Sequence, residues 1–263
     1  MNSEVAPILK IEALQSGYHT PKGTVKVSGV IDLELYPGEL VAVVGPNGVG
    51  KSTLLRTIAG VQPALSGSIL LNGKFLESYP PKDLAENLSI VLTERIPAGN
   101  LTASELIALG RQPYTNWIGS LSSEDKEMID QVLEKLDLKG LRDRSCYEMS
   151  DGQLQRVMIG RALAQDTPLI VLDEPTSHLD IYHKAYIFKL LRTIAHDTSK
   201  TVLFSSHEID LAIQLCDKVL VLQEDHSDFG EPCNLIEKGS FMSLFPSDLI
   251  RFDKATGTYK IEK

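Results

Sequence analysis

A glycine-rich stretch carries the clearest chemical signal in the sequence. Residues 45–53 match the pattern G-x-x-x-x-G-K-[ST], whose glycines let successive backbone N–H groups turn toward phosphate oxygens. The apolar residues 40–44 predict a buried strand before this loop, and residues 52–59 predict a helix after it. We expect Lys51 to reach the β- and γ-phosphates of a nucleotide and the Ser52 hydroxyl to bind Mg²⁺. The predicted phosphate-binding residues are Gly45, Pro46, Asn47, Gly48, Val49, Gly50, Lys51, Ser52 and Thr53.

Two carboxylates and a histidine follow apolar strands further along the chain. Residues 169–172 predict a buried strand that ends at Asp173 and Glu174, and a strand at 201–204 leads to His207. Ligands of open parallel sheets bind at the carboxyl ends of the strands, so these side chains are expected near the phosphate loop. Asp173 is predicted to hold Mg²⁺, Glu174 to act as general base on the attacking water, and His207 to contact the γ-phosphate.

Tyr18 follows Gly17 in a segment that reads as a polar loop. An aromatic ring ahead of a phosphate loop can stack on a nucleotide base. The alternative is a tyrosine half-buried at the end of a strand, which would give the same sequence pattern. On these residues alone, the half-buried tyrosine is the favoured interpretation.

The other predicted elements divide the chain into a sheet region and a helical region. Residues 102–164 read as helical throughout, with capping boxes at 102–105 and 122–125, and we interpret them as part of a subdomain inserted into a sheet domain. Further strands are predicted at 8–14 (as an edge strand), 30–35, 66–71 (running into an Asn-Gly turn), 88–92 and 218–222, and a helix is predicted at 181–195.

Composition limits the class of protein. The chain has 263 residues, 43% hydrophobic and 23% charged, which is ordinary for a globular protein. The three cysteines are widely spaced and suggest neither a disulfide framework nor a metal site. A net charge of −9 argues against a nucleic-acid partner. No apolar run approaches the length of a membrane span and no secretory leader is evident, so any membrane role is expected to act through a partner.

A second motif connects these features to a known family. Residues 149–156 read Met-Ser-Asp-Gly-Gln-Leu-Gln-Arg, which resembles the LSGGQ-x-QR signature of ATP-binding cassette (ABC) ATPases, and residues 177–180 resemble the D-loop of that family. The resemblance covers roughly residues 8–240. It implies an α/β fold: a P-loop NTPase core with an antiparallel β edge and an inserted α-helical subdomain. We therefore expect one ABC ATPase domain at 1–240, the insertion at about 94–164, and a C-terminal tail at 241–263.

The resemblance also implies roles for further residues. Two subunits of such ATPases pack head to tail, so ATP lies between the phosphate loop of one and the signature of the other. Ser150 and Gly152 would then donate to the γ-phosphate across the interface. Tyr18 would be the aromatic that stacks on adenine, and His207 the switch histidine. The resemblance adds the following residues to the predicted ATP-binding set: Tyr18, Ser150, Gly152, Gln153 and Asp180.

Two positions depart from the family pattern. Asp151 stands where the signature usually has glycine, and a carboxylate beside a phosphate is unfavourable unless it points away. Thr93 stands where the family has the glutamine that contacts Mg²⁺, and it is followed by Glu94. The Thr93 hydroxyl is predicted to contact the metal, with Glu94 as the alternative.

The expected function is that of a transport ATPase. Residues 110–114, Gly-Arg-Gln-Pro-Tyr, resemble an element of the ATPases that serve importers of iron–siderophores, haem and cobalamin. This resemblance implies ATP and Mg²⁺ as cofactors, a homodimer, integral-membrane permease subunits with an external solute-binding protein, and a peripheral location on the cytoplasmic face of the inner (plasma) membrane. The alternatives are a soluble ABC-type ATPase of translation or DNA repair, and a binding-only regulator that does not turn over.

Overall fold

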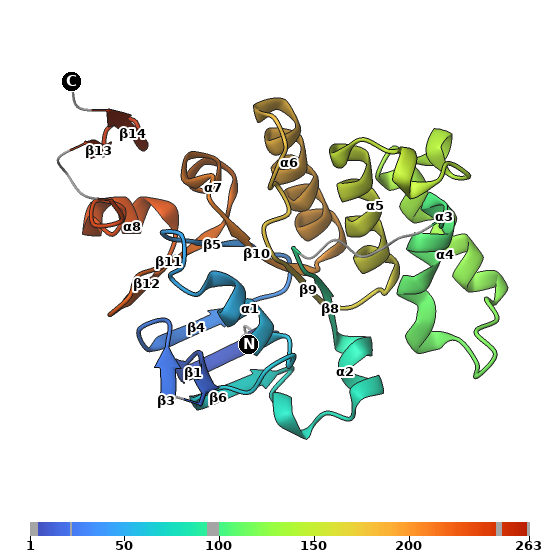
Figure 1. The fold of residues 1–263 in the computed structure, drawn as a ribbon, viewed down its shortest axis with the longest axis horizontal. Helices are drawn as coiled ribbons and strands as arrows, with labels where there is room; N and C mark the ends of the chain where they lie inside the picture. Colours follow the sequence, from blue (N-terminus) through green and yellow to red (C-terminus); the bar gives the residue numbers. More distant parts are fainter. Residues whose placement is uncertain (1–4, 22, 94–99, 246–248, 262–263) are drawn as a thin grey trace.

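The computed structural model describes residues 5–21, 23–93, 100–245 and 249–261, and a six-stranded sheet runs through its centre (Figure 1). The strand order is β12-β11-β5-β10-β9-β8, with all neighbours parallel except the antiparallel edge strand β12. The strands are β5 (Leu40–Val44), β8 (Leu88–Val91), β9 (Leu169–Leu172), β10 (Thr201–Ser206), β11 (Lys218–Leu222) and β12 (Ser227–Gly230).

An antiparallel sheet packs beside this one, in the order β4-β1-β6-β7. Its strands are β1 (Leu9–Gln15), β4 (Ile31–Leu35), β6 (Ser66–Leu71) and β7 (Lys74–Phe75). The expectation that residues 8–14 form an edge strand is wrong, because β1 pairs with β4 on one side and with β6 on the other. Strand β1 alternates only loosely, and pairing with a strand over fifty residues away leaves no local trace in the sequence.

Helix α1 (Lys51–Ile58) lies between the two sheets. Alternation along β5 directs Val41 and Val43 toward α1, while Leu40, Ala42 and Val44 face a second apolar core on the opposite side. That second core contains α5 (Asp151–Ala164), α6 (Ile181–Thr198) and α7 (Ile209–Leu215). Both faces of the parallel sheet are therefore covered, which explains its uninterrupted apolar strands.

The region predicted to be helical forms one end of the molecule (Figure 1). It contains α3 (Ala103–Ala108), α4 (Ser123–Lys135) and α5, and both predicted capping boxes are confirmed, at Thr102 with Glu105 and at Ser122 with Asp125. The chain therefore has an α/β fold, with an antiparallel β subdomain and a helical region. Short 3₁₀ helices lie at Leu76–Ser78, Leu109–Tyr114, Lys139–Leu141 and Cys146–Glu148, and α2 spans Pro81–Asn87.

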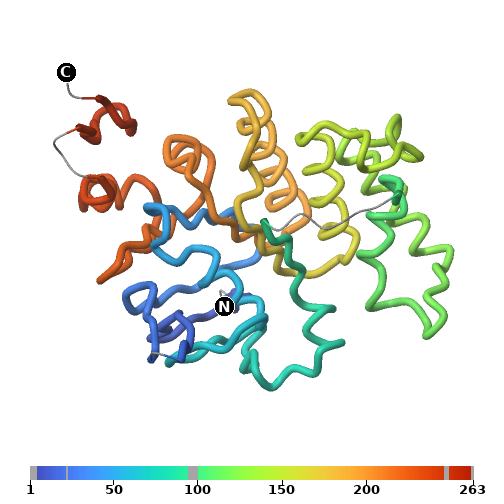
Figure 2. Tube along the Cα trace, viewed as in Figure 1, coloured from blue at the N-terminus to red at the C-terminus, as the bar shows by residue number. Residues whose placement is uncertain are grey.

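The C-terminal segment ends at the other side of the molecule from the helical region (Figure 2). Helix α8 (Pro232–Lys238) is followed by a hairpin of β13 (Ile250–Asp253) and β14 (Thr258–Ile261). The hairpin packs through Phe252, whose ring stacks on that of Phe241 at 5.4 Å. No helix among the described residues is long and apolar enough to cross a membrane.

Candidate site for nucleotide binding and hydrolysis

The phosphate loop joins β5 to α1, as its strand–loop–helix pattern predicted. Gly50 caps α1 with a φ of 100°, and a Cβ there would lie 2.7 Å from Cγ2 of Val27, so only glycine fits this position. Helix α1 then begins at Lys51, which points its N-terminal N–H groups toward the loop. The loop residues 45–50 and the first turn of α1 (Lys51, Ser52 and Thr53) therefore form one continuous cradle suited to an anion.

The Lys51 side chain folds back over this loop. Its buried Nζ donates to the carbonyl oxygens of Gly45 at 2.9 Å and Pro46 at 3.0 Å. Burial lowers the pKa of Lys51, and the charges of Glu174 and Asp173 oppose that shift. The ammonium group is thus held between the loop and the two carboxylates, where it can pair with phosphate oxygens.

Ser52 and Asp173 come together from α1 and the end of β9. The Ser52 hydroxyl donates to Oδ1 of Asp173 at 3.0 Å. A hydroxyl and a carboxylate are the hard oxygen donors that Mg²⁺ prefers, and Mg²⁺ is usually completed by water and substrate phosphates rather than by a full protein cage. The donor set present is therefore suited to Mg²⁺ carried by a nucleotide.

Glu174 and His207 also meet at this edge of the sheet. Oε1 of Glu174 lies 2.7 Å from Nε2 of His207. The Glu174 backbone has a φ of 49°, in the left-handed region, and this turn carries its side chain toward the histidine. The two side chains remain partly exposed, so both can contact a ligand.

One residue in this network was not singled out from the sequence. Ser205 donates to Oδ1 of Asp173 at 2.7 Å and accepts the backbone N–H of Glu174 at 2.8 Å. The predicted strand ended at 204, whereas β10 continues to Ser206. The available signal was a polar residue at the same level as Asp173 on the neighbouring parallel strand. That signal can be recognised only when it is known which strands are neighbours.

Thr93 contacts the main chain of Asp173. Its hydroxyl donates to the main-chain carbonyl of Asp173 at 3.2 Å rather than to the carboxylate. Glu94, the alternative, lies outside the described residues. Thr93 therefore sits beside the metal site through the backbone of Asp173.

The signature residues begin α5, in a different part of the molecule. Ser150 caps this helix in a reciprocal arrangement with Gln153: the Ser150 hydroxyl accepts the Gln153 N–H at 3.3 Å, and Gln153 Oε1 accepts the Ser150 N–H at 3.1 Å. A hydroxyl that accepts in a cap keeps its own proton for donation. The helix N-terminus, with Gly152 in its first turn, therefore presents donors suited to an anion.

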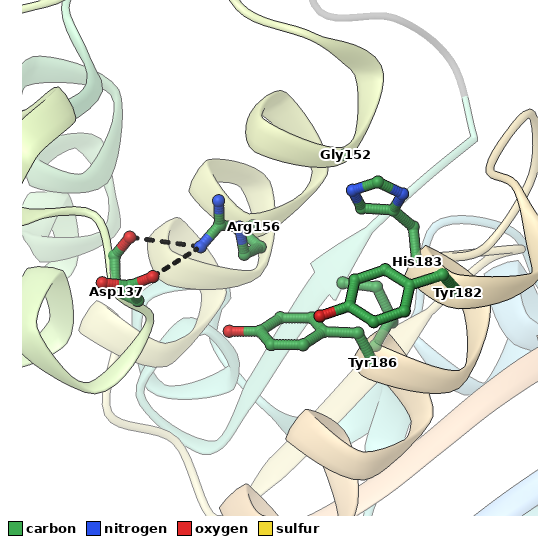
Figure 3. Close-up of a pocket in the computed structure, with 7 residues that line it drawn as sticks. Asp137, Gly152, Arg156, Tyr182, His183 and Tyr186 are labelled. Atoms are coloured by element: carbon green, nitrogen blue, oxygen red, sulfur yellow. Dashed lines mark hydrogen bonds and ion pairs between the residues drawn. The ribbon is translucent and has the colours of Figure 1, made fainter.

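The D-loop end meets the signature across a small pocket (Figure 3). Asp180 caps α6 by accepting the His183 N–H at 2.8 Å. Its Oδ1 also lies 2.8 Å from Nδ1 of His183, and these contacts with His183 lower the pKa of Asp180. The His183 ring faces Gly152: a Cβ on Gly152 would lie 3.1 Å from Cδ2 of His183. The pocket, of about 160 Å³, is lined by Asp137, Gly152, Arg156, Tyr182, His183, Tyr186 and Ile187.

Tyr18 lies in a strand rather than in the polar loop expected from the sequence. It belongs to β2 (Gly17–Thr20), which pairs with β3 (Gly23–Lys26), and Tyr18 is opposite Val25. A two-stranded hairpin of mostly polar residues lacks the apolar alternation that marks a half-buried strand, which is why the sequence pattern missed it. The Tyr18 side chain is 48% exposed, which leaves its ring accessible.

Hydrogen bonds thus link one group of predicted residues directly. Ser52, Asp173, Glu174 and His207 form a connected set with Ser205, next to the loop that holds Lys51. Ser150 and Asp180 make their capping bonds within their own helices, α5 and α6. The chain therefore carries two separate groups of candidate ATP contacts.

A comparison of the sequence with models of known protein families identifies the family of this chain. The model of the ABC transporter family matches residues 29–177, more than half of the chain. The chain belongs to the ABC transporter family, as its ATP-binding subunit, and it is an ATPase that couples ATP hydrolysis to transport.

Three relatives match most of the chain. An uncharacterized ABC transporter ATP-binding protein of Methanocaldococcus jannaschii is 37% identical over 97% of this chain and 87% of the relative. A probable siderophore transport system ATP-binding protein of Bacillus subtilis is 33% identical over 82% of this chain and 77% of the relative. A petrobactin import ATP-binding protein of Bacillus anthracis is 34% identical over 82% and 79%. The chain is thus related to the ATPases of siderophore importers.

Two solved structures have the same fold. An ABC transporter described as of metal-chelate type, in an inward-facing conformation, has a TM-score of 0.77 and 28% identity over 91% of this chain and 89% of that chain. A dimeric ATP-binding cassette in a post-hydrolysis state with ADP and Pi has a TM-score of 0.70 and 25% identity over 84% and 97%. ABC ATPases of this type dimerise and pair with membrane permease subunits.

Proposed function

We propose that this chain powers the import of iron–siderophore-type solutes by hydrolysing Mg²⁺-ATP in a head-to-tail homodimer. The observation that carries the hydrolytic part is the hydrogen-bonded set of Ser52, Asp173, Glu174 and His207 at the phosphate loop. The solute class is supported by the siderophore importers among the relatives, with haem and cobalamin as the neighbouring solute classes.

In the proposed mechanism each charged side chain has one task. Lys51 neutralises charge on the β- and γ-phosphates, and Ser52 and Asp173 hold the metal. When bound, Mg²⁺ would supply further positive charge beside the phosphate oxygens. Glu174 accepts a proton from the attacking water, and its 2.7 Å contact with His207 holds the carboxylate in place.

The dimer follows from the separation of the two groups of ATP contacts. A second copy would bring its Ser150 and Gly152 to the γ-phosphate held by the first copy, at the positive end of α5. Ile181 and Tyr182, at the start of α6 beside the D-loop, are 82% and 72% exposed, which suits a face covered by a partner. The exposed Tyr18 ring is proposed to stack on adenine.

The partners and location follow the same reasoning. The dimer would sit on the cytoplasmic face of the inner (plasma) membrane, bound to two permease subunits, with an external protein delivering the solute. The acidic net charge of −9 supports the absence of nucleic acid among its partners.

Two experiments test this proposal. First, phosphate release by the purified chain is measured with and without Mg²⁺, and Glu174→Gln is expected to abolish turnover while ATP binding persists. Steady turnover by Glu174→Gln would contradict the assigned base. Absence of turnover in the unaltered chain and in its membrane complex would favour a binding-only regulator.

Second, the tagged chain is purified from gently solubilised native membranes, and its partners are identified by mass spectrometry. The complex is then reconstituted in vesicles with the external binding protein and each candidate solute. Stimulation of ATP hydrolysis by ferric siderophores is expected. If only haem or cobalamin stimulates hydrolysis, the proposed solute class is wrong. If the tagged chain is purified without any polytopic membrane partner, the proposed transport role is wrong.

A further inference from the structure

Ser205 occupies a position where the strand pattern calls for an apolar residue. It is fully buried in β10, on the same face of the sheet as Leu203, which belongs to the core around α1. Strands β10 and β9 are parallel, with Phe204 paired to Leu172. The next residue of each strand, Ser205 and Asp173, therefore lies at the same level, immediately where the candidate site begins.

The Ser205 hydroxyl makes two hydrogen bonds that involve both carboxylate residues. It donates to Oδ1 of Asp173 at 2.7 Å and accepts the backbone N–H of Glu174 at 2.8 Å. A hydroxyl has one proton and two lone pairs, so it can do both at once. The same Asp173 oxygen accepts the Ser52 hydroxyl at 3.0 Å, which fixes the carboxylate from α1 as well.

The bond to Glu174 acts at a turn that few residues adopt. With a φ of 49°, the Glu174 backbone persists only where its surroundings fix it. The Ser205 hydroxyl accepts the Glu174 N–H, and the Glu174 carbonyl accepts the Ser177 N–H at 3.1 Å. This turn directs the Glu174 carboxylate to its 2.7 Å contact with His207.

We propose that Ser205 is a positioning residue, whose single hydroxyl fixes both the metal-holding Asp173 and the general base Glu174 relative to each other. Ser205 is fully buried, and it acts through its hydrogen bonds to these two residues. The inference rests on the roles proposed above for Asp173 and Glu174.

The test compares Ser205→Ala with a matched loss of a hydroxyl at the other end of the same strand. Thr201 is equally buried in β10, and its hydroxyl donates to the Tyr36 carbonyl at 2.8 Å, away from the site. Thr201→Val is therefore the control for a buried hydroxyl lost from this strand. The measured quantities are kcat and KM for ATP, the melting temperature, and the affinity for Mn²⁺ in the presence of ADP, read by electron paramagnetic resonance.

Ser205→Ala is expected to lower kcat and weaken Mn²⁺ binding by roughly 10- to 100-fold, while KM for ATP stays within about twofold. Thr201→Val is expected to lower only the melting temperature. Ser205→Thr keeps the hydroxyl and is expected to restore Mn²⁺ affinity and most of kcat. A purely structural serine would give the opposite pattern, in which Ser205→Ala and Thr201→Val differ from the unaltered chain in melting temperature alone.

Two further variants keep the result interpretable. If Ser205→Ala does not fold, Ser205→Cys keeps the side-chain volume with a much weaker donor, and unchanged kcat and Mn²⁺ affinity in Ser205→Cys would overturn the proposal. Glu174→Gln separates this inference from the proposed function. If Glu174→Gln abolishes turnover while Ser205→Ala behaves like Thr201→Val, the Ser205 proposal alone fails; if Glu174→Gln still turns over, the proposed function fails first.

Discussion

Arg111 and Asp125 form a buried ion pair that fastens the helical region, and its loss should be costly. Nε of Arg111 donates to Oδ1 of Asp125 at 2.7 Å, and Nη1 of Arg111 donates to the Ala164 carbonyl at 2.8 Å. The guanidinium also lies 4.1 Å from the centre of the Tyr114 ring. Because Ala164 is the last residue of α5, the helix that carries the signature, this pair fixes that helix to its neighbours.

The magnitude follows from what Arg111→Met leaves behind. The Asp125 side chain is 5% exposed and keeps two 2.9 Å hydrogen bonds, from the Ser122 N–H and the Ser122 hydroxyl. Removing one partner of a buried ion pair costs about 3–5 kcal/mol, and the two remaining bonds place the expected loss near the lower end, at about 3 kcal/mol. For a chain of this size, that loss lowers the melting temperature by roughly 6–12 °C.

The assay is urea unfolding followed by circular dichroism, with Arg142→Met as the matched control. Arg142 pairs with Asp130 in the same helical region, but the side chains are 46% and 56% exposed, so its loss should cost under about 1 kcal/mol. Arg111→Met combined with Asp125→Asn removes the buried charge and should recover at least about 1 kcal/mol relative to Arg111→Met. Equal losses for Arg111→Met and Arg142→Met, or no recovery in the double variant, would refute the reasoning.

The Arg111–Asp125 pair also determines how the stability of the folded state changes with pH. Burial opposes ionisation of Asp125, but hydrogen bonds from Arg111 and Ser122 outweigh it, so the pKa of Asp125 lies below its ordinary value of 3.8. A carboxyl whose folded pKa is depressed stabilises the folded state fully above its unfolded pKa. The stabilisation is therefore complete above about pH 4, and it is lost as the pH falls through the lower folded value.

Three further predictions concern the nucleotide site. Glu174→Gln should lower kcat for phosphate release by about 10²- to 10⁴-fold with ATP binding retained in equilibrium dialysis, and an unchanged kcat would exclude it as the base. Tyr18→Ala should weaken ATP binding by about 1–3 kcal/mol in calorimetry, whereas Tyr18→Phe keeps the ring and should bind normally; equal affinities would remove the stacking role. Gly152→Ala places a Cβ 3.1 Å from the His183 ring, so it should reduce ATP-dependent dimerisation in gel filtration, with partial recovery when His183→Ala is added; no recovery would show that crowding by His183 is not the cause.

Much of the fold could be read from the sequence because its signals are local. The strand at 40–44, the phosphate loop and the start of α1 are contiguous, so the run of apolar residues and the glycine pattern place them directly. The capping boxes of α3 and α4 span only four residues each, and both occur as expected.

What the sequence could not supply depends on which segments become neighbours. Strand β1 was expected at an edge because its pairing with β6 involves residues far along the chain. Ser205 escaped notice because its partners, Asp173 and Glu174, are reached only through the register of β10 on β9. Tyr18 was placed in a loop because the β2–β3 hairpin has no apolar face that would mark it as strand.

The two groups of candidate ATP contacts in one chain explain why this ATPase should act as a pair. Ser52, Asp173 and Glu174 are joined by hydrogen bonds at one edge of the sheet, whereas Ser150 caps a helix of the helical region. In the proposed head-to-tail dimer, a phosphate bound to the loop would gain the signature donors from the second copy, and each copy would offer the same set in return. His183 bonds to Asp180 and faces Gly152, so in each copy the D-loop and the signature start from adjoining helix ends. We therefore expect a nucleotide held between two copies of the proposed dimer to contact both elements together, so that its hydrolysis would release the two copies from each other.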